Sequence, residues 1–339
     1  MNMKISLAEF SQKKELVDLW IETFGDDEYF VNSFIESYMI GEYNVPVALV
    51  DGKIVSTLYL IDFDLYSNLE NIGVCSYLFA AATDKEYRNR GLMSRLIEYA
   101  AELCKNRGIK AIFLFPQNQS EDLFRYYAKF GFKDIYKTKK IYKIDSELEA
   151  PSNIADLQLE LKAADICDVE TFDELYESYI DFSVRQSLSP VKDRLFYFKC
   201  AKSYLDSAED LNGESDKELT EENTCFAILK NNVEKFCYVF YKKSKNVYYI
   251  DDIIYIKCDK VTENINNLRG EQDKVIALLA GYIKNQGCDY EINGLPIDDI
   301  IDDISDKNDS LAMILPLNKQ VENIIDSLKV PVYLNMFMN

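Results

Sequence analysis

The spacing of apolar residues at the start of the chain predicts two helices. Leu16, Leu19 and Trp20 recur at helical intervals, which indicates an amphipathic helix over residues 9–24. The Gly25-Asp26-Asp27 segment then breaks the pattern, and either aspartate can cap a second helix. The residues of this second helix that we expect to face inward are Phe30, Val31, Phe34, Ile35 and Tyr38.

A strand pattern follows these helices. Residues 46–50 are apolar, and the next two residues, Asp51-Gly52, are a strong signal for a type I′ turn between antiparallel strands. We expect the partner strand over 53–61 and a separate third strand that includes 63–66.

The stretch from Tyr77 to Gly108 has three parts. It begins with an apolar run over 78–83, continues with a polar turn over 84–91, and then takes a helical pattern from Leu92 onward. Gly108 is a natural stop for that helix. The order is therefore a strand, a basic turn that contains a glycine, and a helix.

This arrangement is suited to an anion. The first turn of a helix has free N–H groups at the positive end of the helix dipole. Gly91 allows a ligand to approach the backbone, and Arg88 and Arg90 add positive charge beside it. A diphosphate fits such a turn. The turn alone is equally compatible with an ordinary strand-to-helix connection that carries two solvated arginines.

Two motifs in this half resemble the GNAT superfamily of acyl-CoA-dependent N-acyltransferases. The first, Arg88-Asn89-Arg90-Gly91-Leu92-Met93, is similar to the family's pyrophosphate loop, although Met93 stands where the family usually has Gly or Ala. The second, Tyr127-Ala128-Lys129-Phe130-Gly131-Phe132, looks like the family's closing motif. A strand over 110–115 and a helix over 120–130 separate the motifs, and the resemblance covers roughly residues 1–145. In the slot where many relatives carry an Asn, this chain has Ser120.

The resemblance implies an α/β (α+β) acyl-CoA N-acyltransferase fold, in which helices flank a mixed, mostly antiparallel sheet. It also implies acetyl-CoA as co-substrate. The pantetheine arm would pair with the strand near Ala81 and Thr83, and backbone N–H groups of that strand would polarise the thioester carbonyl. The residues expected to contact acetyl-CoA are Ala81, Ala82, Thr83, Arg88, Asn89, Arg90, Gly91, Leu92, Met93, Ser94 and Ser120.

Tyr127 occupies the position of the family's general acid, which would protonate the leaving thiolate. The alternative is a packed aromatic residue, and Tyr126 is the neighbouring competitor on another side of the helix. The general base stays open. Its candidates are Tyr77, Asp84, Glu86, the C-terminal carboxylate of Asn339 and water.

The second half of the chain repeats the outline of the first. Residues 227–241 predict a hairpin around an Asn231-Asn232 turn, 248–256 a strand, 270–286 a helix ended by Gly287, and 288–292 a strand. We therefore expect a duplicated fold of the two-copy, Eis-like branch, with a linker over 145–156 and an exposed acidic loop over 206–223. The predicted domains are residues 1–147 with the acetyl-CoA site and a degenerate copy over 156–339.

The second copy lacks the first copy's chemistry. Asn267 stands where the first copy has Arg88, Glu271 follows the glycine, and Asp306 replaces the tyrosine. The acidic residues of 296–303 are expected to form a solvated face or to receive cations. Segments 311–317 and 332–337 are predicted as closing strands. We expect this copy to shape the acceptor cleft or the interface of a homo-oligomer.

Composition narrows the chemistry. The chain has 339 residues, no histidine and a net charge of −20. The absence of histidine excludes Ser-His-Asp catalysis, and the eight cysteines include no Cys-x-x-Cys pair, so no metal site is expected. The acidic balance argues against a nucleic-acid partner. It is explained by solubility or, alternatively, by attraction of a cationic acceptor such as an amine. No apolar run is long enough to cross a membrane and no signal peptide is evident, so we expect a cytoplasmic protein.

These observations together predict an N-acetyltransferase. The acceptor would be a primary amine of a small molecule or peptide, attacking the thioester directly in a ternary complex. One alternative is a non-catalytic acyl-CoA-binding, scaffold or regulatory protein, which would keep the loop but show no turnover. Another is a purely structural two-domain partner protein, which would not bind CoA.

Overall fold

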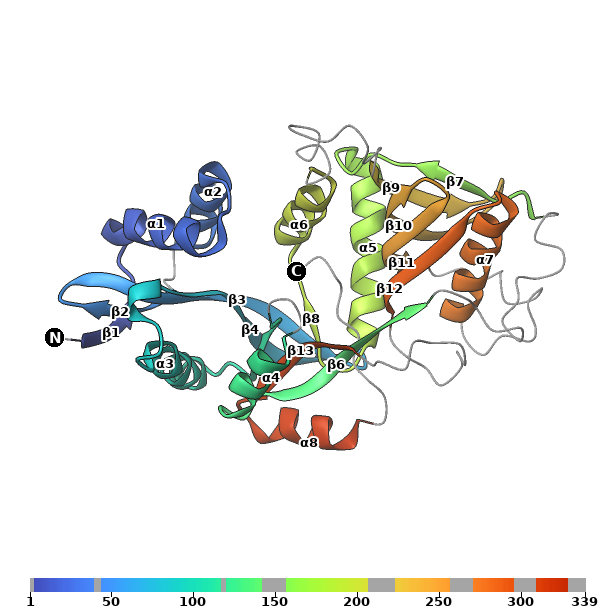
Figure 1. Ribbon diagram of the computed structural model, residues 1–339. Coiled ribbons are helices and arrows are strands. Elements are labelled where there is room, and N and C mark those ends of the chain that lie inside the picture. The colour runs from blue at the N-terminus through green and yellow to red at the C-terminus, as the bar shows by residue number, and fades with distance from the viewer. Residues whose placement is uncertain are drawn as a thin grey trace. The chain divides into compact units, whose positions relative to one another are not determined.

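The computed structural model describes residues 3–39, 44–116, 120–141, 157–206, 223–256, 271–295 and 309–328. The chain divides into two compact units (Figure 1). The first unit comprises Met1–Leu65, Asn71–Ile135 and Leu311–Leu328, and the second comprises Tyr66–Glu70, Tyr136–Ser310 and Lys329–Asn339.

The first unit contains a mixed sheet with helices on both faces. Strands β1, β2, β3, β4, β5 and β13 follow in that spatial order. The pairs β1–β2, β2–β3 and β5–β13 are antiparallel, and β4–β5 is parallel. The elements in chain order are β1 (Met3–Leu7), the 3₁₀ turn η1 (Phe10–Gln12), α1 (Lys13–Phe24), α2 (Glu28–Met39), β2 (Pro46–Val50), β3 (Lys53–Ser67), β4 (Glu70–Thr83), the 3₁₀ turn η2 (Lys85–Tyr87), α3 (Leu92–Asn106), β5 (Ala111–Leu114), α4 (Glu121–Ala128), β13 (Asp309–Pro316) and α8 (Lys319–Ser327). Strand β6 (Lys133–Ile141) begins in this unit, and most of its residues belong to the second unit.

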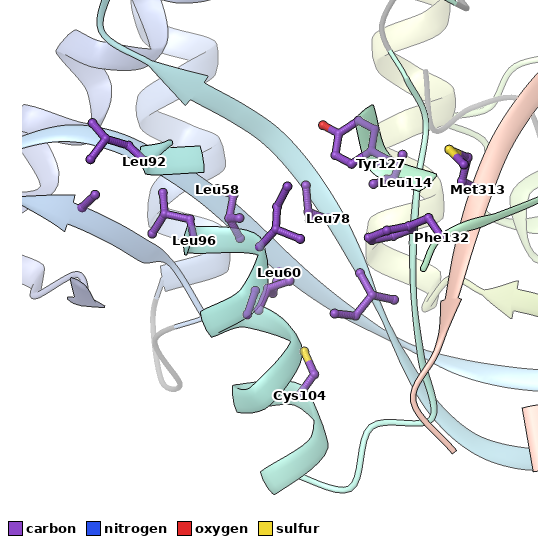
Figure 2. Close-up of a cluster of buried hydrophobic side chains, with 14 of the residues drawn as sticks. Leu58, Leu60, Leu78, Leu92, Leu96, Cys104, Leu114, Tyr127, Phe132 and Met313 are labelled. Carbon is purple, nitrogen blue, oxygen red and sulfur yellow. The ribbon is translucent and has the colours of Figure 1, made fainter. Parts of the chain in front are cut away.

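Each face of this sheet has its own core. On one face, residues of α3 and α4 pack on β3, β4 and β5, and Met313 of β13 joins them. Figure 2 shows part of this cluster, with Leu92 and Leu96 of α3 near one end and Phe132 and Met313 near the other. On the other face, α1 and α2 bury a group around Trp20 against β2, β3 and β4.

Most predicted elements of the first half are confirmed. The Asp51-Gly52 turn has positive φ at both residues, 50° and 88°, as a type I′ turn requires. Asp27 caps α2 by accepting a hydrogen bond from the N–H of Phe30. The side chain of Phe30 was expected to face inward, and this is wrong: it is exposed, while Val31 and Ile35 are buried.

The separate strand expected over 63–66 is also wrong, because β3 runs unbroken from Lys53 to Ser67. Asp62 lies between the two predicted strands. In the structure its carboxylate accepts a hydrogen bond from Ser76 and pairs with Arg107, so a polar residue is accommodated inside a continuous strand. Strand β1 was not predicted.

The second unit is built in the same order. Its sheet runs β12, β11, β10, β9, β7, with β11 and β12 parallel, and the end of β6 pairs with β12. Its elements are β7 (Glu160–Ala163), α5 (Val169–Arg185), β8 (Ser189–Val191), α6 (Arg194–Asp206), β9 (Asn223–Lys230), β10 (Lys235–Ser244), β11 (Val247–Tyr255), α7 (Glu271–Asn285) and β12 (Asp289–Leu295).

The duplication is visible in the packing. Helices α5 and α6 pack on one face of the second sheet and α7 on the other, as α1 and α2 face α3 in the first unit (Figure 1). Asp193 caps α6 through the N–H of Phe196, in the same way that Asp27 caps α2. The predicted duplicated fold is therefore confirmed.

Two details of the second half differ from prediction. The turn of the first hairpin has four residues, 231–234, because Lys230 pairs with Lys235. Asn231 does not adopt a left-handed backbone but accepts hydrogen bonds from the N–H groups of Val233 and Glu234, which selects the longer turn. The predicted strand over 311–317 exists as β13, and it pairs with β5 in the first unit.

Several predictions fall outside the described residues. They concern the linker (145–156), the acidic loop (206–223) apart from its ends, the positions of Asn267 and Asp306, the acidic segment (296–303) and the strand over 332–337. The boundary between the predicted domains, 1–147 and 156–339, stays a prediction for the same reason.

Candidate active site

Strand β4 contains a bulge. Ala80 has φ of 44°, and the side chains of Phe79 and Ala80 both pack on the α1–α2 side, whereas Leu78 and Ala81 pack on the α3 side. Two consecutive residues on one face are the mark of an extra residue in the strand. The bulge bends β4 just where a ligand was expected to pair with it.

Beyond the bulge, β4 extends past its parallel neighbour. The described register between β4 and β5 ends at Tyr77 opposite Phe113, whereas β4 continues to Thr83. An extended ligand can pair with backbone groups at such an edge. Ala81, Ala82 and Thr83, which the sequence placed at the pantetheine arm, all lie on this segment.

The turn after β4 is held by local hydrogen bonds. The carboxylate of Asp84 accepts from the N–H of Glu86 and caps η2. Arg88 donates from Nε to the carbonyl of Thr83 at 3.1 Å, and Arg90 donates to the carbonyl of Glu86 at 2.8 Å. Both arginines are exposed, so their positive charge is fixed at the surface of the turn.

Helix α3 begins without a side-chain cap. Gly91 is its N-cap residue, with φ of 72°, and Asn89 is also left-handed with φ of 61°. The first intrahelical bond of this turn runs from the N–H of Arg95 to the carbonyl of Gly91, so the N–H groups of the first three helical residues project from the helix end. The space where a Cβ of Gly91 would lie is empty to 4 Å.

The side chains at this helix end have different environments. Leu92 is buried and Met93 half-buried in the α3 core, so both can meet a ligand mainly through the backbone. Ser94 is half-buried, and its hydroxyl lies 3.1 Å from the hydroxyl of Tyr126 on α4. The turn thus brings together all predicted residues from Arg88 to Ser94.

Tyr127 lies on α4, with its ring in the α3 core. Burial raises the pKa of its hydroxyl to about 12, and the neighbouring Tyr126 adds to the shift. Among the described residues no hydrogen bond to this hydroxyl is found. Figure 2 shows it pointing away from Phe132 and Met313. A neutral tyrosine in this environment can donate a proton over the whole physiological pH range.

Ser120 forms the N-cap of α4 through its backbone. Its carbonyl accepts from the N–H groups of Leu123 and Phe124, while its side chain caps no helical N–H. The nearest asparagine, Asn118, lies outside the described residues. The structure therefore leaves the role of Ser120 at the donor as a prediction.

Two of the candidate general bases, Tyr77 and Asp84, make contacts that stabilise the fold. Tyr77 is buried and stacks on Phe113, with ring centroids 5.0 Å apart. Asp84 caps η2 and lies 3.6 Å from the ammonium of Lys53. Glu86 is exposed, and Asn339 lies outside the described residues.

The contact between Ser94 and Tyr126 was not predicted from the sequence. The two residues are 32 positions apart, and no pattern in either helix signals that they meet.

The described residues contain no group of three or more acidic, cysteine or histidine side chains able to hold a metal. In the same residues no helix is long and apolar enough to cross a bilayer.

Comparison with known proteins identifies the domain and the fold. The sequence model of the acetyltransferase (GNAT) domain matches residues 4–135. No curated protein matches the chain. A conserved protein of Enterococcus faecalis V583, described as a probable N-acyltransferase, is 14% identical, and the match covers 95% of this chain and 74% of that one with a TM-score of 0.65.

Two further solved structures match at similar levels. A GCN5-related N-acetyltransferase from Anabaena variabilis ATCC 29413 is 13% identical over 94% of this chain and 73% of its own, with a TM-score of 0.63. Eis1 from Mycobacterium abscessus is 13% identical over 94% of this chain and 74% of its own, with a TM-score of 0.62. At such identities the likeness concerns the fold, which extends over nearly the whole chain.

Proposed function

Because residues 4–135 form an acetyltransferase domain of the GNAT family, the domain of an acyltransferase enzyme, we propose that this protein transfers an acetyl group from acetyl-CoA to a primary amine. The observation that carries the proposal is the uncapped start of α3, which follows the left-handed Gly91 and lies beside two exposed arginines. An anion completes the hydrogen bonds of such a helix end.

The diphosphate of acetyl-CoA binds this helix end. Its oxygens accept from the N–H groups of Leu92, Met93 and Ser94, and the left-handed Asn89 and Gly91 give the backbone the concave form that binds anions. The guanidinium groups of Arg88 and Arg90 add positive charge, and each can keep its hydrogen bond to a backbone carbonyl while another of its N–H groups faces the diphosphate.

The pantetheine arm lies along β4 between the bulge and Thr83. Its amides pair with the strand edge that extends past β5. The bulge at Ala80 turns backbone N–H groups out of the regular ladder, and one of them polarises the thioester carbonyl as negative charge develops on its oxygen.

The amine attacks the thioester directly, the tetrahedral intermediate collapses, and the C–S bond breaks. Tyr127 donates its proton to the departing thiolate of CoA. Its buried, neutral hydroxyl supports this role. The base that deprotonates the attacking amine is a water molecule or one of the carboxylates considered above.

The acceptor is a cation. A net charge of −20 attracts amines, which are protonated in solution, and disfavours nucleic acid. The second unit contributes to the acceptor cleft or to a homo-oligomer, and we expect the protein to act in the cytoplasm.

The test is a two-step measurement on the whole protein. Acetyl-CoA should raise the unfolding temperature, and free CoA should then be released in the presence of a suitable amine from a panel of polyamines, aminoglycosides and lysine peptides. A thermal shift without CoA release for any amine would favour the non-catalytic acyl-CoA-binding alternative. No thermal shift with acetyl-CoA would overturn the donor site itself.

A further inference from the structure

Tyr126 connects the two elements of the candidate active site. Its hydroxyl lies 3.1 Å from that of Ser94, the third residue of α3, while its ring packs at 5.3 Å from the ring of Tyr127. The ring of Phe130 is equally close on the other side. Tyr126 therefore contacts both the start of the helix that receives the donor and the residue that acts as acid.

The two tyrosines also interact electrostatically. After burial, Tyr126 is the next cause of the raised pKa of Tyr127. Helix α4 itself has only eight residues, and its N-cap side chain makes no capping bond. A helix this short depends on its packing for a fixed position. The Ser94–Tyr126 hydrogen bond is thus a specific polar tie between α4 and the start of α3.

We propose that Tyr126 is a positioning residue that couples donor binding at α3 to the placement of Tyr127. The inference rests on the proposed function. When the hydroxyl of Ser94 donates a hydrogen bond to a phosphate oxygen of the donor, the oxygen of Ser94 is left as an acceptor, and the hydroxyl of Tyr126 donates a hydrogen bond to it. Donor binding thereby sets the direction of this bond and strengthens it.

The consequence is ordering of α4 by the donor. Without the bond, the donor still binds to the backbone of α3, but the hydroxyl of Tyr127 is less well placed against the leaving sulfur. Displacement of a reacting group by about 1 Å can cost on the order of 100-fold in rate. A single lost tie should cost less, because the ring packing around Tyr126 remains.

The kinetic test uses substitutions that keep this packing. Tyr126→Phe should lower kcat about tenfold and change the KM for acetyl-CoA by less than about threefold, since it removes the Ser94–Tyr126 hydrogen bond but no group that contacts the donor. Ser94→Ala should lower kcat by the same factor and also raise KM. The double variant should show the kcat of either single variant, and Ser94→Thr should restore it.

The matched control is Tyr99→Phe. Tyr99 is a half-buried tyrosine of α3 that lies outside the site, so its hydroxyl should be dispensable. Additive losses of kcat in the double variant, or an unchanged kcat in Tyr126→Phe, would show that the two hydroxyls do not act together.

Hydrogen exchange with CoA as the probe gives a readout independent of turnover. In the wild type, CoA should protect the amides at the start of α3 and those of α4, and in Tyr126→Phe only the protection of α4 should be lost. Protection of α4 that persists in the variant, or that is absent in the wild type, would overturn the coupling. If CoA leaves the start of α3 unprotected in the wild type, the proposed donor site itself fails.

Discussion

The two units have the same arrangement of strands and helices, but the side chains at the bulge of the corresponding strands, β4 and β11, differ. In the first unit, Ala80, Ala81 and Ala82 follow one another at the bulge of β4, and small side chains leave its edge accessible. In the second unit, the register between β10 and β11 skips Asp251, which makes it the extra residue of a bulge in β11. Acidic side chains thus stand where the first unit has alanines.

The surroundings of the two bulges differ as well. Tyr204 of α6 donates a hydrogen bond of 2.6 Å to Asp251, and Asp252 is buried. Lys192, which precedes the cap of α6, is fully buried, and its ammonium lies near the rings of Tyr179 and Tyr197. The residue at the same place in the first unit is Asp26, which is exposed and accepts from the indole of Trp20.

This comparison shows how two copies of one fold can place different side chains around the same bulge. In the second unit, Lys192 and Asp252 are buried on the α5–α6 side of the bulge. We therefore assign the bulged part of β11 a structural role. Burial lowers the pKa of Lys192 to about 8, while Cys200 and Asp252 oppose the shift. At the corresponding place the first unit has Asp26, which is exposed, and the arginines of its turn, Arg88 and Arg90, are exposed as well.

The largest expected effect comes from Gly91→Glu. The new carboxylate would lie at the positive end of α3 and repel a diphosphate, and the left-handed backbone adds strain of about 1 kcal/mol. We expect no thermal shift at acetyl-CoA concentrations that saturate the wild type.

Gly108→Glu is the matched control, because Gly108 has φ of 76° at the other end of the same helix and also faces open space. It should cost similar stability and leave donor binding intact. Normal binding of acetyl-CoA by Gly91→Glu would mean that the donor lies elsewhere. The proposed difference between the units, a donor site in the first and none in the second, would then be unsupported.

The next effect is expected for Tyr127→Phe. Loss of the acid should lower kcat about 1,000-fold, within the range for a general acid, and leave the KM for acetyl-CoA within about twofold. Steady-state rates of CoA release measure both. Because the ring stays packed in the α3 core, the unfolding temperature should hardly change. Equal turnover of the two proteins would remove Tyr127 from the chemistry.

In the second unit, Lys192→Met should lower stability by about 3 kcal/mol, because Asp252 is left buried without the neighbouring positive charge. Adding Asp252→Asn should recover most of this loss. Urea unfolding measures both changes. Acetyl-CoA binding by the double variant should equal that of the wild type. A double variant that folds but no longer binds acetyl-CoA would contradict the structural role assigned to this pair.

The sequence predicted the parts of the fold that depend on local chemistry. Gly91, Gly108 and Gly287 mark helix ends because each has a left-handed backbone, and Asp51-Gly52 marks a turn for the same reason. Gly91 also marks the turn before α3, where a left-handed backbone is present. Tyr127 was singled out because its motif includes a glycine and an apolar tail at fixed spacing, and the roles of the turn and of Tyr127 stay predictions.

Features that depend on distant contacts could not be predicted. The pairing of β13 with β5 joins segments about 200 residues apart, and nothing in either strand specifies the other. The bulge at Ala80 lies in a run that is apolar on both faces, so no alternation reveals the extra residue. Lys192 follows an ordinary Ser-Pro-Val sequence, and only the packing of α5 and α6 around it shows that it is buried.

The smallest effect concerns pH. A tyrosine acts as an acid only when protonated, and an exposed tyrosine with a pKa near 10 would halve kcat at about pH 10. Burial raises the pKa of Tyr127 to about 12, so its protonated form persists to higher pH and about 99% remains at pH 10. The kcat for CoA release should therefore show no decline due to this residue between pH 7 and pH 10.

The measurement needs a control for unfolding, because other groups of the protein titrate in the same range. Far-UV circular dichroism should be followed in each buffer, because the emission of exposed tyrosines itself changes when they ionise. Only pH values at which the spectrum is unchanged should be compared. If kcat halves near pH 10 while the fold is intact, and the residual rate of Tyr127→Phe does not, then Tyr127 titrates as an exposed tyrosine does. The hydroxyl of Tyr127 would then be solvated when it acts as the acid. Its burial would not contribute to catalysis.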